Sequence, residues 1–127
     1  LVGSLEEKNK FYNKLIKDIK EELIIDLFGY NLTLTSAYMK QSDIFIGNDS
    51  GLMHLAVASK LRVISLFGPT NNTVYGPIGD NNIVIRTKEN YDYFKSIKID
   101  ENKSYMSSIK PEIVFKKCEK IINDNFN

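Results

Sequence analysis

Long apolar runs and paired cysteines are the first features that this sequence of 127 residues lacks. No apolar run approaches the roughly 20 residues that a membrane-spanning helix needs, and we see no charged-then-apolar leader. Cys118 is the only cysteine, which excludes an intrachain disulfide and fits a reducing compartment. These observations predict a soluble protein and indicate no membrane anchor in this sequence.

An excess of charge of one sign is also missing. Seventeen Lys and Arg residues face sixteen Asp and Glu residues, so the formal net charge is only +1 and a nucleic-acid partner is not predicted. The sequence has no paired Cys or His spacing, no Asp-x-Asp and no Walker-type glycine loop. We therefore predict neither a metal site nor a P-loop.

The sequence is expected to be part of a longer protein. Its first residue is not methionine, and Leu1-Val2-Gly3 is typical of the end of a strand whose beginning is missing. No linker or internal repeat divides the sequence, and its apolar content is ordinary for a globular domain. We predict one domain over residues 1–127, taken from a longer protein.

Apolar spacing predicts alternating helices and strands. Apolar residues recur every three or four positions in segments 5–22, 32–41, 51–59 and 108–122, which predicts helices. Short apolar runs predict buried strands over 23–28, 43–47, 62–67 and 82–86. A Thr or Ser is expected to cap the second helix, while 68–79 is expected to be a loop and 87–105 mostly irregular. This order predicts an α/β fold with a parallel sheet covered on both faces.

The stretch GNDSGLMHLA, from Gly47 to Ala56, is the first candidate site. It places Asp49, Ser50 and Gly51 between a predicted strand and a predicted helix, at the edge where parallel sheets bind ligands. A helix N-terminus there offers unpaired N–H groups and a partial positive charge to an anion such as a phosphate. Because Asp and Ser are also favoured helix caps, the spacing alone leaves capping and ligand contact equally open.

Two further features have similar alternatives. His54 lies one helical turn beyond Ser50, where it would contact the same ligand or brace the turn; a role as catalytic base is the less common one. Gly68-Pro69-Thr70 is a second small-residue turn after a strand, and a rigid loop start competes with phosphate contact there. Cys118, on an apolar helix face, is expected in the core.

Two motifs carry a family resemblance. DIFIGNDSGLMHLA, from Asp43 to Ala56, followed by VISLFGPT, from Val63 to Thr70, closely resembles the C-terminal half of glycosyltransferase family 9, the ADP-heptose:lipopolysaccharide heptosyltransferases. The order and separation of the two motifs match as well. IKPEIV, from Ile109 to Val114, resembles the last helix of the family, so the resemblance covers nearly the whole sequence.

The resemblance implies a GT-B enzyme, with two facing Rossmann-like domains of which this chain is the C-terminal, nucleotide-sugar-binding one. Asp49 matches the acid that contacts the donor sugar, and Ser50 and Gly51 match the turn that binds the diphosphate. His54 matches the motif histidine beside them. The resemblance also places in the donor site the turn residues Gly68, Pro69 and Thr70, with Tyr30 against the nucleobase and Glu7, or its neighbour Glu6, on the ribose.

The implied reaction is inverting transfer of heptose from ADP-heptose to the lipopolysaccharide inner core, without a metal cofactor. The general base and the acceptor contacts belong to the absent N-terminal domain, so we expect no catalytic residue here and an inactive isolated chain. Association with the inner face of the inner membrane would come only through the acceptor. Two alternatives stay open: a GT-B transferase with another nucleotide-sugar, and a stand-alone α/β nucleotide-binding regulatory module.

Overall fold

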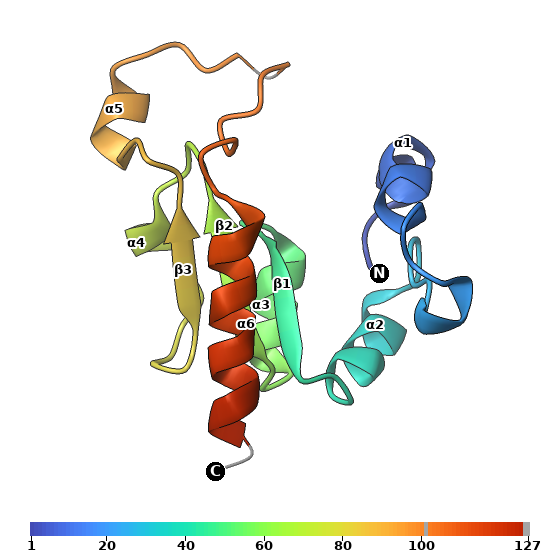
Figure 1. Cartoon of the computed structure of the whole chain (residues 1–127). Helices are drawn as coiled ribbons and strands as arrows, with labels where there is room; N and C mark the ends of the chain where they lie inside the picture. The colour runs from blue at the N-terminus through green and yellow to red at the C-terminus, as the bar shows by residue number, and fades with distance from the viewer. Residues whose placement is uncertain (101, 126–127) are drawn as a thin grey trace. The chain divides into compact units, whose positions relative to one another are not determined.

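The structure, a computed structural model, describes residues 1–100 and 102–125. It divides into two compact units, residues 1–38 and residues 39–127, each of which is described here by itself. Both units are drawn in Figure 1. None of the helices in the described ranges is long and apolar enough to cross a bilayer.

The second unit is built on a parallel sheet of three strands in the order β1-β2-β3. These strands are β1 (Ile44–Asn48), β2 (Arg62–Phe67) and β3 (Ile83–Arg86). The register pairs Asn48 with Leu66 and Phe67 with Arg86, so all three strands end at the same edge. The predicted strands 43–47, 62–67 and 82–86 are therefore confirmed to within one residue.

Helices cover both faces of this sheet, as the sequence predicted. In Figure 1, α6 (Pro111–Asn125) lies in front of the sheet and α3 (Gly51–Ala58) lies behind it. Ile64, Ile85 and Ile121 form a core cluster between the sheet and α6, and the predicted core residue Cys118 of α6 packs against it. On the α3 side, fully buried side chains include Met53, Ala56, Val63 and Phe67.

The amide of Asn82 completes the sheet at the edge where β2 and β3 begin. Its Oδ1 accepts a hydrogen bond from Val63 N at 3.1 Å, and its Nδ2 donates to Ile78 O at 2.8 Å and Gly79 O at 3.3 Å. Asn82 directly precedes β3, and Val63 precedes the residue that pairs with Ile83. A side chain thus adds one more interstrand bond beyond the backbone ladder.

The segments expected to be irregular each contain a short helix. Within 68–79 lies α4 (Asn72–Tyr75), and within 87–105 lies α5 (Tyr91–Lys95). Asn71 and Asn90 supply their N-caps, and helices of four and five residues are too short to show a hydrophobic period in the sequence. Phe94 of α5 is buried and packs edge-on against Tyr105, with ring centroids 5.5 Å apart.

The first unit contains α1 (Leu5–Ile16), the 3₁₀ helix η1 (Glu21–Leu23) and α2 (Leu32–Met39), whose last residue falls in the second unit. The prediction that the first helix extends to Glu22 is wrong. Ile19 and Leu23 are exposed, so little packing supports the helical pattern beyond Ile16. The cap of α2 also differs from the prediction, because Asn31 Oδ1, and not a Thr or Ser, accepts from Leu34 N at 2.9 Å.

The predicted buried strand 23–28 is not a strand of the sheet. Leu23 and Ile25 are exposed, and the apolar run is extended without regular strand assignment. Among the described residues, its long-range backbone partners are residues 1–3: Leu1 N donates to Ile25 O at 2.6 Å, Leu27 N to Leu1 O at 2.8 Å and Gly29 N to Gly3 O at 2.9 Å. This pairing is parallel, as predicted, but too short to form a regular ladder.

Candidate functional site

The turn between β1 and α3 leaves the start of the helix open. Ser50 occupies the N-cap position with extended backbone angles, φ −159° and ψ 166°, but its side chain caps no helix N–H. Within the described ranges Asp49 makes no capping bond either. The capping interpretation of Ser50, which the sequence left open, is therefore wrong in this structure.

Gly51, the first residue of α3, borders open space. A Cβ built on Gly51 would meet no atom within 4 Å, whereas one built on Gly47 would lie 2.7 Å from the ring of Phe45. Packing therefore explains the glycine at position 47 but not the glycine at position 51. When no neighbouring atom requires a glycine at the start of a helix, the missing side chain leaves room for a ligand to approach the backbone closely.

His54 lies one turn into α3 and is exposed. Its imidazole has no hydrogen-bond partner among the residues that the structure describes, so this side chain does not brace the turn. Contact between His54 and a ligand stays a prediction.

The turn after β2 is built against the segment that precedes α6. Gly68 is buried, Pro69 is partly buried and Thr70 is exposed. A Cβ on Gly68 would lie 3.1 Å from Cγ of Met106, so this glycine does have a packing reason. The rigid-loop interpretation of the turn is supported, and ligand contact remains a prediction.

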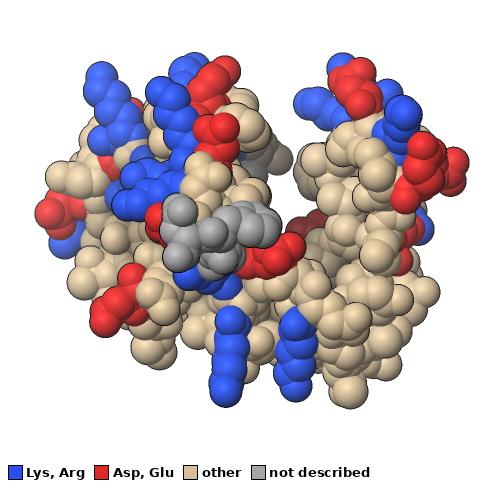
Figure 2. Space-filling model, turned by 60° about the horizontal axis from the view of Figure 1, so that its bottom comes forward, with Lys and Arg blue, Asp and Glu red and all other residues tan. Residues whose placement is uncertain are grey.

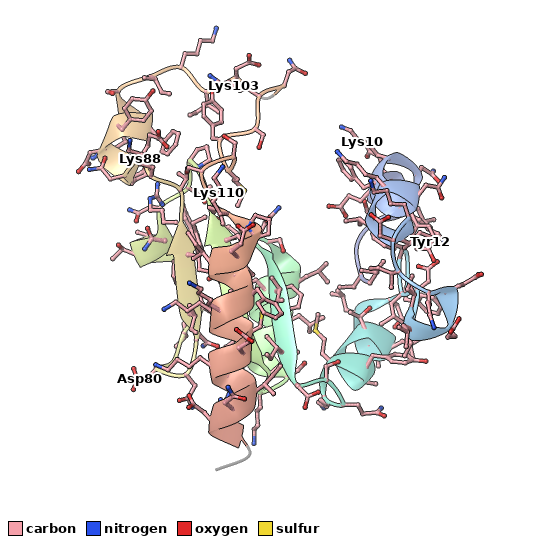
Figure 3. The ribbon with its side chains drawn as sticks, in the orientation of Figure 1. Lys10, Tyr12, Asp80, Lys88, Lys103 and Lys110 are labelled. Carbon is pink, nitrogen blue, oxygen red and sulfur yellow. The ribbon has the colours of Figure 1, made fainter. Side chains whose placement is uncertain are left out.

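These two turns leave adjacent strands at one edge of the sheet. The register of β1 and β2 brings Asn48 beside Leu66, and each turn begins directly after that point. Figure 3 shows the polarity of the unit: Asp80 precedes β3 at one end, and Lys88 follows β3 at the other, toward which Lys110 also lies. The structure thus brings together Asp49, Ser50, Gly51 and the 68–70 turn at the ligand-binding edge of an α/β sheet.

Arg86, the last residue of β3, belongs to the same edge and was not predicted as a site residue. Its Nη1 donates to Thr70 O at 2.7 Å and to Asn72 Oδ1 at 3.0 Å, and its Nε donates to Glu89 O at 3.3 Å. The signal was present in the sequence, since a single arginine follows the apolar run IVI where the fourth predicted strand ends. Its partners, however, become visible only in three dimensions.

The two predicted nucleoside contacts lie in the first unit. Tyr30 is exposed, two residues before α2. The carboxylate of Glu7 completes a capping box: Oε2 accepts from Ser4 N at 2.7 Å, while Ser4 Oγ accepts from Glu7 N at 3.2 Å. Glu7 therefore has a structural role at the start of α1, and its contact with a ribose stays a prediction.

Other features of the described surface lie away from this edge. A cavity of about 300 Å³ lies at the opposite edge of the sheet, lined by residues that include Lys60, Arg62, Ile78 and Asn82. In the described part of the chain, no three His, Cys, Asp or Glu side chains are grouped to hold a metal ion. On the face shown in Figure 2, basic and acidic side chains are interspersed.

The fold and the arrangement of its turns define a Rossmann-like α/β domain, the class that the sequence predicted. The family model described as Glycosyltransferase family 9 (heptosyltransferase) matches residues 1–105. The chain belongs to glycosyltransferase family 9.

Individual relatives agree with this assignment. The chain is 36% identical over 90 residues to lipopolysaccharide heptosyltransferase 3 of Escherichia coli K12, covering 70% of this chain and 26% of that protein. It is 35% identical over 105 residues to lipooligosaccharide heptosyltransferase 2 of Haemophilus influenzae, covering 80% of this chain and 30% of that protein. The chain thus spans less than a third of the length of these relatives.

A solved structure is also similar. The crystal structure of a family 9 glycosyl transferase from Veillonella parvula matches 97% of this chain and 36% of its own, with a TM-score of 0.78 and 25% sequence identity. The predicted GT-B-type α/β fold is therefore confirmed.

Proposed function

We propose that this chain is the donor-binding domain of an inverting glycosyltransferase that transfers heptose from ADP-heptose to the lipopolysaccharide inner core. The observation that carries the proposal is the uncapped start of α3, where Gly51 borders open space beside the turn at residues 68–70. The names of the relatives supply the sugar and the acceptor.

The chemistry follows from the charge that develops on the leaving group. An acceptor hydroxyl forms a new bond to the anomeric carbon while the bond from that carbon to the diphosphate oxygen breaks, with inversion. The N–H groups and the positive end of the α3 dipole stabilise the negative charge that grows on the departing nucleoside diphosphate. Asp49, half-buried beside them, holds the donor sugar, and His54 contacts the same ligand.

The nucleoside contacts come from this chain, whereas the acceptor chemistry lies outside it. Tyr30 stacks on the nucleobase and Glu7 contacts the ribose, while the general base and the acceptor contacts come from an N-terminal domain. The isolated chain binds a nucleotide weakly and does not transfer sugar. The complete enzyme works in the cytoplasm and meets the inner membrane through its acceptor, with no metal ion required.

Titration of the chain with ADP, UDP and GDP tests the proposal. We expect saturable binding with a preference for ADP, and weaker binding in the Gly51→Val variant, whose added side chain fills the space in front of the helix start. Preference for UDP or GDP would favour a transferase that uses another nucleotide-sugar. Absence of binding by all three nucleotides would overturn the assignment of the donor site to this edge.

The third alternative, a stand-alone regulatory module, is tested separately. Joined to the N-terminal domain of a family 9 relative, the chain should support heptose transfer from ADP-heptose. Tight nucleotide binding without any transfer in such a two-domain protein would favour the regulatory module.

A further inference from the structure

Arg86 connects the end of β3 to the turn after β2. The two acceptors of its Nη1 are Thr70 O, the last carbonyl of the small-residue turn, and Asn72 Oδ1 at the start of α4. Because guanidinium donors form a rigid planar fork, one side chain fixes both acceptors relative to the sheet. The position of the turn is therefore set from β3 as well as from the strand that it follows.

The charge of Arg86 is not neutralised by its hydrogen-bond partners. All three acceptors are backbone carbonyls or an amide oxygen, and no ion pair to Arg86 is found in the described ranges. Its Nη2 is buried and has no partner among the same residues. The guanidinium also lies 5.9 Å from the ring centroid of Phe94, which packs against it without cancelling the charge.

We propose that Arg86 is a positioning residue for the diphosphate of the bound nucleotide. Its planar guanidinium fixes the position of the turn at residues 68–70. Its positive charge, which is not paired with a carboxylate, favours an anion at the edge where β1, β2 and β3 end. This proposal rests on the proposed function, because it assigns the anion to the diphosphate of a nucleoside diphosphate.

Two substitutions separate the effect of the planar guanidinium from the effect of its positive charge. Arg86→Lys keeps a positive charge but replaces the planar fork with a single ammonium, and Arg86→Met keeps only the apolar stem. Arg62→Lys is the matched control, because Arg62 is the only other arginine and lies at the opposite edge, where its Nη1 donates to Ile121 O at 3.3 Å.

The first measurement needs no nucleotide. Amide hydrogen exchange should become faster in residues 68–76 in both Arg86 variants, and it should stay unchanged there in Arg62→Lys. Unchanged exchange in this segment in both Arg86 variants would overturn the positioning role.

The second measurement is an NMR titration of the same variants with ADP and with adenosine, which lacks the diphosphate. We expect ADP affinity to fall about tenfold in Arg86→Lys and further in Arg86→Met, while adenosine affinity changes less than about threefold. If Arg86 only supported the fold, its substitution would weaken the binding of ADP and of adenosine equally, and that result would overturn the proposal.

The outcomes also separate this proposal from the one on which it rests. If the unmodified chain binds ADP and both Arg86 variants bind it equally well, the role of Arg86 is wrong and the donor site stands. If the unmodified chain does not bind ADP, the proposed function fails, and the assignment of Arg86 to a diphosphate fails with it.

Discussion

Gly68 lies directly against Met106: a Cβ built on the glycine would be 3.1 Å from Cγ of the methionine. Thirty-eight positions separate the two residues in the sequence, yet their contact joins the turn after β2 to the segment that leads into α6. A nearby polar cluster strengthens the same connection, with Ser108 Oγ 2.6 Å from Thr87 Oγ1 and accepting from Lys88 N at 2.9 Å. The segment at 87–105, which had no role in the sequence, thus begins and ends beside the candidate site.

The Gly68–Met106 contact predicts that Gly68→Ala destabilises the chain. The added methyl group overpacks this contact, so we expect a loss of about 1 kcal/mol in the free energy of unfolding. In the double variant with Met106→Ala, the loss should be smaller than the sum of the two single losses, because truncation makes room for the methyl group. Urea denaturation measures all three variants, and strict additivity would contradict the contact.

Substitution of Gly51 is expected to separate stability from binding. Because a Cβ there meets no neighbouring atom, Gly51→Ala should leave the free energy of unfolding unchanged or raise it by up to about 1 kcal/mol. The same methyl group occupies the space in front of the helix start, so ADP affinity should fall, and Gly51→Val should lower it further. The control is Ala58→Val, which adds bulk at the exposed last residue of α3. Equal ADP affinity in all of these variants would argue against a phosphate at Gly51.

The first unit is expected to lose stability in acid because of Asp26. Its carboxylate forms an ion pair with Lys8 and accepts from Phe28 N at 3.0 Å. The bond from Lys8, followed by that from Phe28 N, lowers the pKa of Asp26 below its ordinary value. A group whose pKa is lower in the folded state stabilises the fold above its unfolded pKa, near about 4, and loses this effect as the pH falls through the folded pKa.

Asp26→Asn isolates this effect because it removes the charge and keeps an acceptor oxygen. The urea midpoint of the unmodified chain should fall between pH 5 and pH 2 more steeply than that of the variant. Asp18→Asn is the control, since Asp18 is 83% exposed and only 3.6 Å from its partner Lys17. Parallel pH profiles for the unmodified chain and Asp26→Asn would contradict the role of the ion pair.

Cys118 is expected to react slowly with thiol reagents. The side chain packs with the Ile64, Ile85 and Ile121 cluster, and its burial raises the pKa of the thiol. Because the thiolate is the reactive form, we expect its reaction with a disulfide reagent at pH 8 to be at least about tenfold slower than that of a free cysteine. Urea should abolish the difference. A native rate equal to that of the free thiol would show that Cys118 is not held in the core.

The sequence predicted the part of the fold in which local and tertiary signals agree. Strand β2 and the helix from Gly51 were placed to within one residue, because their apolar patterns match their burial in the sheet. The run 23–28 has an equally strong pattern, but only residues 1–3 pair with it and Ile25 remains exposed. Apolar content identifies a potential strand, but its partners decide whether it becomes one.

The candidate site was predictable where it follows from strand order. Asp49, Ser50, Gly51 and the turn at Gly68 all follow predicted strands, so a parallel sheet had to bring them to one edge. Arg86 and Met106 could not be assigned in this way, because their relevance comes from side-chain contacts between segments distant in the sequence. The capping box at Glu7 shows the opposite problem: a residue given a ligand role by resemblance already has a local structural partner.

The hydrogen bonds of the Asn82 amide make the two ends of the sheet different. At the end where the strands begin, this one side chain bonds to both neighbouring segments and locks the strand register. The loops at the other end, which hold the donor in the proposed function, can therefore differ in sequence while the strands stay aligned from this end. Such a division would let donor specificity evolve without rebuilding the sheet.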